Sequence, residues 1–234
     1  MEPLQIRETA TGLVVDGFPD AVKLIKIDGP TARHAADLSL HKHDLEFAYR
    51  CLVKITEVSP DDQTLQQALW TSALISYFKC FNLGGGVRSG LDQDLVYAGN
   101  EAALACFEYF SHLRSKHVVH DVNPFIHCTP GAVLNREDDE YKIAKITFTN
   151  EYTQTLDQQP FDSMVSLVRE ALAFVEREFD TACAEITKDL EAKPYAELFG
   201  QEVVQLRGAA NHTHVSRSRA SGNAPGRKSK REGR

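Results

Sequence analysis

The strongest constraint on the fold is a long apolar stripe in the last third of the chain. Large apolar residues recur there at alternating steps of four and three over nearly four heptads. The stripe consists of Phe161, Val165, Val168, Leu172, Val175, Phe179, Ala182 and Ile186. This spacing keeps one face of a straight helix apolar, and Pro160 fits the first turn of such a helix. Because so long an apolar face has to pack lengthwise against other helices, the sequence predicts a helical bundle.

Three further helices are predicted upstream of this stripe. Residues 31–55 carry a leucine at every seventh position from Leu38, with alanine and isoleucine on the same face. Residues 62–82 follow an aspartate N-cap and are apolar nearly all round, which predicts a buried central helix. Residues 93–119 form the third, and Asn123 before a proline ends it.

Short strands are predicted on either side of the first three helices. Residues 4–27 contain three apolar runs, two of them separated by a turn at Thr9–Gly12. Residues 125–134 and 140–149 flank an acidic turn and predict a β-hairpin. The fold class is therefore mainly α, with four principal helices, a β-hairpin before the last helix and short N-terminal strands. The predicted domains are a strand segment at residues 1–30, a helical domain at 31–206 with the hairpin inserted at 125–149, and a tail at 207–234.

The net charge of −7 conceals two segments of opposite sign. Residues 207–234 contain eight of the 26 basic residues and one of the 33 acidic ones, giving +7, so residues 1–206 carry −14. The tail has almost no large apolar residue and is expected to be disordered. Two interpretations of it stay open. It is either a solvated tail or an arm that holds nucleic acid through phosphate charge.

Several classes of protein are excluded by the sequence. No apolar run approaches the length of a membrane span, and the segment after Met1 lacks the pattern of a secretory signal. Five cysteines, far apart and odd in number, indicate reduced thiols in a cytoplasmic protein. The histidines show no zinc-ligand spacing, so we expect no metal or other cofactor. Gly84–Gly86 fit a flexible connector better than a phosphate-binding loop, and no serine-hydrolase elbow is present.

One segment, residues 112–121, combines the residue types that cleave RNA without a metal. Arginine supplies a permanent planar charge suited to a phosphorane, and histidine supplies a proton donor or acceptor near neutral pH. On a regular helix Arg114 and His120 project roughly 120° apart, so they converge only at a helix end or across a dimer. The alternative is structural, because basic residues at a helix C-terminus complement the helix dipole.

The string from Leu113 to Asp121, with five residues between Arg114 and His120, resembles the R-x4–6-H motif of the HEPN superfamily. The upstream string from Leu69 to Phe81 is similar to the buried helix of its small prokaryotic members, and the resemblance covers about residues 33–190. It implies a HEPN-like helical bundle that dimerises and brings two motifs into one cleft. Many members are metal-independent ribonucleases in toxin–antitoxin or phage-defence systems.

Carried over to this chain, the resemblance assigns the catalytic positions to Arg114 and His120. Supporting or phosphate-binding roles fall to Ser115, Lys116, His117, Glu46 and Arg88, although Ser115 stands where Asn, Asp or His is commoner. The expected partners are a second copy of the chain, RNA, and an antitoxin or other protein. The alternative is a non-catalytic HEPN-like binding or scaffold module, which the acidic body favours because it repels RNA. A helical metalloprotein is a third, weaker interpretation.

Overall fold

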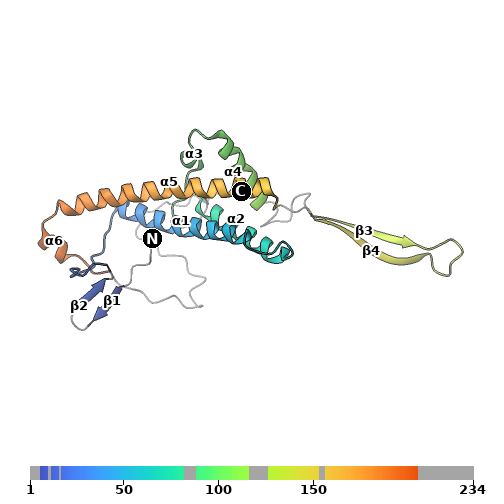
Figure 1. The fold of residues 1–234 in the computed structure, drawn as a ribbon, viewed down its shortest axis with the longest axis horizontal. Helices are drawn as coiled ribbons and strands as arrows, with labels where there is room; N and C mark the ends of the chain where they lie inside the picture. Colours follow the sequence, from blue (N-terminus) through green and yellow to red (C-terminus); the bar gives the residue numbers. More distant parts are fainter. Residues whose placement is uncertain are drawn as a thin grey trace, which may run out of the picture. The chain divides into compact units, whose positions relative to one another are not determined.

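The structure is a computed structural model that describes residues 6–9, 12–15, 17–81, 88–115, 126–152 and 156–204. Over these residues the protein is mainly helical, as the sequence predicts (Figure 1). The described helices are α1 (Pro30–Ile55), α2 (Gln63–Cys80), α3 (Gln93–Val96), α4 (Glu101–Leu113), α5 (Gln158–Glu191) and α6 (Tyr195–Gly200). The strands form two antiparallel pairs, β1 (Ile6–Thr9) with β2 (Gly12–Val15) and β3 (Ile126–Leu134) with β4 (Ile143–Tyr152). Residues 207–234 lie outside the described residues.

The described residues divide into two compact units. One, the helical unit, comprises the described parts of 35–83 and 90–181. It holds most of α1, all of α2, α3 and α4, the amino-terminal part of α5, and the β3–β4 hairpin. The other comprises the described parts of 1–34, 84–89 and 182–234.

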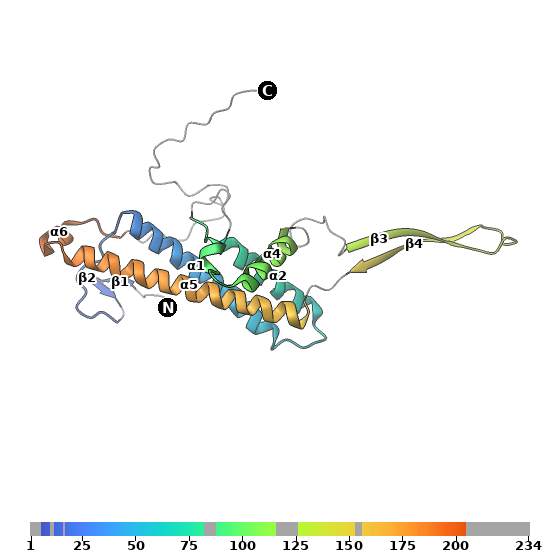
Figure 2. The same ribbon diagram turned by 90° about the horizontal axis from the view of Figure 1, so that it is seen from above.

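Aromatic side chains from α2 and α4 form the centre of the helical unit. The ring of Phe107 lies 5.2 Å from that of Phe78 and 4.9 Å from that of Phe81, measured between centroids. One helical turn farther along, Trp70 meets Phe110 edge to face at 5.9 Å. These contacts fix α4 against α2, and both views show α1 and α2 running beside α5 (Figures 1 and 2).

Two ion pairs connect α1 to its neighbours in the helical unit. The ammonium of Lys42 on α1 donates to Glu176 on α5 at 2.6 Å, and this hydrogen bond raises the pKa of Lys42. The ammonium of Lys79 on α2 donates to Asp44 on α1 at 2.8 Å. Because Asp44 is only 8% exposed, its pairing keeps a buried charge compensated.

The predicted single helix over residues 93–119 is wrong, because the structure contains two helices there. The short α3 ends at Val96, and Gly99 then adopts a positive φ of 79°. Asn100 caps α4, with its side chain accepting from the amide of Ala103 at 3.1 Å. A glycine in the left-handed region ends one helix, and the asparagine N-cap that follows begins the next. The apolar periodicity continues through both helices and therefore did not reveal the break.

Other expectations hold in part. The two predicted hairpins form, while residues 24–27 make only one isolated bridge, from Ile25 to Val203. The predicted buried central helix is α2, which has Trp70, Leu74 and Tyr77 fully buried, whereas its apolar Leu65 and Ile75 are exposed. The short α6 has no counterpart among the predicted elements.

Candidate functional site

Arg114 directly follows the last residue of α4. The apolar face of α4 anchors the helix, since Phe107, Phe110 and Leu113 are all buried in the core. The backbone amide of Arg114 donates to the carbonyls of Phe110 and Ser111, and the chain widens into a π-helical turn at Arg114 and Ser115. π-type turns are rare and frequent at functional sites. The core packing of α4 therefore places this arginine firmly at the helix end.

The side chain of Arg114 lacks compensation within the described part of the chain. The residue is half-buried, and its Nε is a buried donor with no hydrogen-bond acceptor there. None of the ion pairs found between described residues includes Arg114. A buried donor without an acceptor is costly, which makes this guanidinium a natural binding partner for an incoming anion.

Ser115 has a local structural role in this turn. Its hydroxyl donates to the carbonyl of Ser111 at 2.9 Å and lies 3.3 Å from the carbonyl of His112. A serine hydroxyl has one proton to donate but can accept as well. Ser115 thus stabilises the helix end and keeps acceptor capacity.

The remaining predicted residues are not gathered around Arg114 by any described contact. Glu46 lies on α1, 4.0 Å from the ammonium of Lys42 and 3.9 Å from the guanidinium of Arg50. Arg88 is half-buried, has interactions of its own, and belongs to the other compact unit. Lys116, His117 and His120 lie outside the described residues.

A groove of about 410 Å³ lies beside α4, and sequence reasoning missed it. Cys106, Tyr109 and Phe110 line it from α4, and Gln159 and Ser163 line it from the first turns of α5. Tyr109 is 47% exposed as a residue, and its ring lies edge to face against that of Phe110 at 5.0 Å between centroids. Phe110 precedes Arg114 by one helical turn, and a helical side chain covers the turn before its own Cα. The signal in the sequence was Tyr109, an aromatic residue beside the buried apolar face of α4 that contains Phe107, Phe110 and Leu113.

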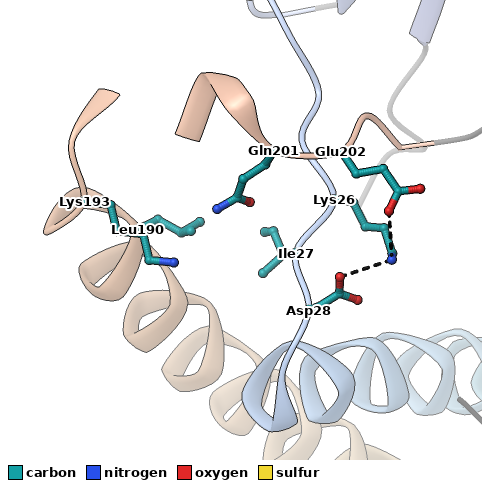
Figure 3. Close-up of a pocket in the computed structure, with 7 residues that line it drawn as sticks. All are labelled: Lys26, Ile27, Asp28, Leu190, Lys193, Gln201 and Glu202. Atoms are coloured by element: carbon teal, nitrogen blue, oxygen red, sulfur yellow. Dashed lines mark hydrogen bonds and ion pairs between the residues drawn. The ribbon is translucent and has the colours of Figure 1, made fainter. Parts of the chain in front are cut away.

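A second pocket, of about 270 Å³, belongs to the other unit and offers no net charge to a ligand (Figure 3). Its Lys26 is bonded to Asp28 at 3.1 Å and to Glu202 at 3.3 Å, and these contacts raise the pKa of Lys26. The amide of Lys26 also donates to the carbonyl of Glu202 at 2.7 Å. These contacts connect the segment before α1 to the segment after α6. The pocket is therefore best explained by the packing of these two segments and not by a ligand.

The cysteines form no disulfide, and two of the five are buried. All five are free thiols. Cys51 and Cys80 are buried, and burial raises the pKa of the Cys51 thiol, which disfavours the reactive thiolate. Across the described residues, no group of three or more His, Cys, Asp or Glu side chains is arranged to hold a metal ion. No described helix is long and apolar enough to cross a membrane.

Comparisons of the chain with protein-family models, with curated proteins and with solved structures find no match. The residues around Arg114 are therefore the basis for inferring a function.

Proposed function

We propose that the chain is a HEPN-like, metal-independent endoribonuclease of the toxin or phage-defence type, acting as a homodimer in the cytoplasm. The observation that carries the proposal is the buried Nε of Arg114 at the end of α4, which has no hydrogen-bond acceptor among the described residues. A scaffold module would be expected to tie this arginine to a carboxylate of the acidic body, and no described carboxylate is paired with it. A buried guanidinium donor with no acceptor among the described residues instead suits a phosphate-binding site, because phosphate oxygens can accept its hydrogen bond.

The proposed reaction needs two proton transfers and one charge-stabilising group. His120, as general base, takes the proton of the ribose 2′-hydroxyl, whose oxygen attacks phosphorus. Arg114 stabilises the charge on the phosphorane oxygens. The bond from phosphorus to the 5′-oxygen then breaks, and a protonated histidine of the second copy gives that oxygen its proton. The products are a 2′,3′-cyclic phosphate and a free 5′-hydroxyl, and no metal enters the balance.

The groove beside α4 supplies a surface for a base next to the scissile phosphate. Its volume of about 410 Å³ admits a planar ring against the exposed face of Tyr109, and the Gln159 amide offers both a donor and an acceptor. Stacking is worth about 1–3 kcal/mol per base, so Tyr109→Ala should raise KM roughly fivefold or more. Tyr109→Phe keeps the ring and should leave KM nearly unchanged, which separates stacking from loss of the hydroxyl.

Cleavage of a labelled RNA of mixed sequence in excess EDTA tests the function. Arg114→Ala should lower kcat roughly 10²–10³-fold, the effect of removing one charge-stabilising donor, and His120→Ala should abolish cleavage. Arg114→Lys keeps the charge but loses the planar fork and should recover little. Arg169→Ala, an equal change of charge at an exposed position on α5, is the matched control and should cleave normally. If all variants cleave alike, or the wild type leaves RNA intact, the chain is better explained as a binding or scaffold module.

A further inference from the structure

The β3–β4 hairpin has one apolar face and one polar face. The register pairs Pro130 with Phe148, Ala132 with Ile146, and Leu134 with Ile143, and residues directly opposite one another share a face. We call this side the apolar hairpin face, and it comprises Cys128, Pro130, Ala132, Leu134, Ile143, Ile146 and Phe148. The other side presents mainly threonines and a lysine, namely Thr129, Gly131, Val133, Lys145, Thr147 and Thr149. Such alternation is the pattern of a sheet that packs on one side.

The structure leaves the apolar hairpin face uncovered. Every residue from 128 to 149 is exposed. Leu134 is 71% exposed, Phe148 60% and Ile146 58%. A lone two-stranded hairpin is marginally stable in water, and a contiguous apolar patch of this kind marks an interaction site. The hairpin therefore needs a partner surface that is itself apolar.

We propose that this partner is the same hairpin of a second copy of the chain, packed face to face about a two-fold axis. Burying four large side chains (Leu134, Ile143, Ile146 and Phe148) removes on the order of 100 Å² each, or roughly 400 Å² per copy. With Cys128, Pro130 and Ala132 added at about 50 Å² each, one copy buries roughly 550 Å² and the two copies together roughly 1,100 Å². This total is just above the roughly 1,000 Å² that a specific interface needs.

The charge distribution fits a second copy in an antiparallel arrangement. In a two-fold interface the same patch meets itself, so a charged centre would repel its own copy. The apolar hairpin face carries no charged residue, whereas the turn between the strands carries Glu137, Asp138, Asp139 and Glu140. An antiparallel stack puts the two acidic turns at opposite ends of the interface. Cys128 near one end of the face then lies close to Leu134 of the second copy.

Analytical ultracentrifugation of the full chain and two single variants tests the interface without any assay of ribonuclease activity. Phe148→Asp places a charge in the apolar hairpin face and should raise the dimer dissociation constant roughly thirtyfold or more, the effect of losing one hot spot. Thr147→Asp, the adjacent residue on the polar face, is the matched control and should leave the dissociation constant nearly unchanged.

A crosslinking experiment covers the case in which Phe148→Asp simply unfolds the hairpin. Leu134→Cys, oxidised in dilute solution, should give a covalent dimer through Cys128 of the second copy, while Val133→Cys on the polar face should not exceed wild type. A monomeric wild-type chain overturns the proposal, whatever other protein it binds. The proposal is also overturned if Phe148→Asp and Thr147→Asp change the dimer dissociation constant equally. It is overturned as well if Val133→Cys gives as much covalent dimer as Leu134→Cys.

Discussion

Two tyrosine hydroxyls in the core of the helical unit give a prediction about stability that depends on the direction of one hydrogen bond. Tyr77 and Tyr97 are both fully buried, and their hydroxyls are hydrogen-bonded to each other. The hydroxyl of Tyr97 also donates to the carbonyl of Leu167 at 3.1 Å. Since a phenol has only one proton to donate, Tyr77 must be the donor to Tyr97. Burial raises the pKa of both phenols, so both remain neutral across the ordinary pH range.

The two single variants should therefore differ in cost. Tyr97→Phe leaves the buried hydroxyl of Tyr77 without its acceptor, which costs about 1–3 kcal/mol of unfolding free energy. Tyr77→Phe leaves Tyr97 still donating to Leu167 and should cost only about 0.5–1.5 kcal/mol. The double variant removes both hydroxyls and leaves neither one buried without a hydrogen-bond partner. It should therefore be no less stable than Tyr97→Phe alone.

Urea denaturation measures all three values, and the chain contains its own probe. Trp70 is the only tryptophan and is fully buried beside Phe110, so its fluorescence reports unfolding of the helical unit. The midpoints should shift at constant m-value, because the variants leave the exposed area of the unfolded chain unchanged. Strictly additive costs, or a larger cost for Tyr77→Phe than for Tyr97→Phe, would refute the assigned direction of the hydrogen bond.

Three further predictions concern capping, pH and salt. Asp62→Ala removes the side chain that accepts a 3.0 Å hydrogen bond from a backbone amide at the start of α2 and should cost about 1 kcal/mol in urea denaturation, while Asp61→Ala beside it should cost much less. The bond to Glu176 raises the pKa of Lys42 above its ordinary 10.5, so the pair stabilises the fold below that pH. That contribution is lost as pH rises through the raised pKa of Lys42. In thermal denaturation at alkaline pH, the difference in unfolding free energy between wild type and Lys42→Met should therefore become smaller. Deleting residues 207–234 should change the slope of log RNA affinity against log salt concentration by less than roughly 0.7, which is the contribution of one phosphate contact to single-stranded RNA. A larger change in this slope would show that the tail binds RNA.

The long helix α5 shows what apolar periodicity can and cannot predict. Its existence and direction follow from the stripe between Phe161 and Ile186, and the helix spans Gln158–Glu191. The most deeply buried residues, however, include Met164, Leu167 and Ala171, each one position before a member of the stripe. An α5 that packs against more than one neighbour buries a face wider than a single heptad seam, and periodicity alone does not reveal how many neighbours there are.

The candidate site was predictable only where local sequence decides the geometry. The position of Arg114 at a helix end follows from the composition of the segment, although the regular helix ends at Leu113, earlier than the predicted residue 119. The role suggested for Glu46 depended on a contact across the bundle. In the structure its described partners are Lys42 and Arg50, one turn away on either side along α1. Pairs at this spacing form on the helix itself and compete with any distant partner.

The proposed function requires RNA to approach an acidic body, so the pairing of the cations matters. In the helical unit Lys42, Lys79 and Arg177 each lie within 4 Å of a carboxylate, so they contribute little net positive potential. Arg114 has no such partner among the described residues and is half-buried, where a charge is screened less by solvent. Arg169 on α5 also has no partner among the ion pairs of the described residues, but it is exposed to solvent, whereas Arg114 is half-buried. Under the proposed function, a half-buried arginine of this kind suits the binding of one phosphate beside the groove of Tyr109, because a planar guanidinium holds a phosphate through two parallel hydrogen bonds.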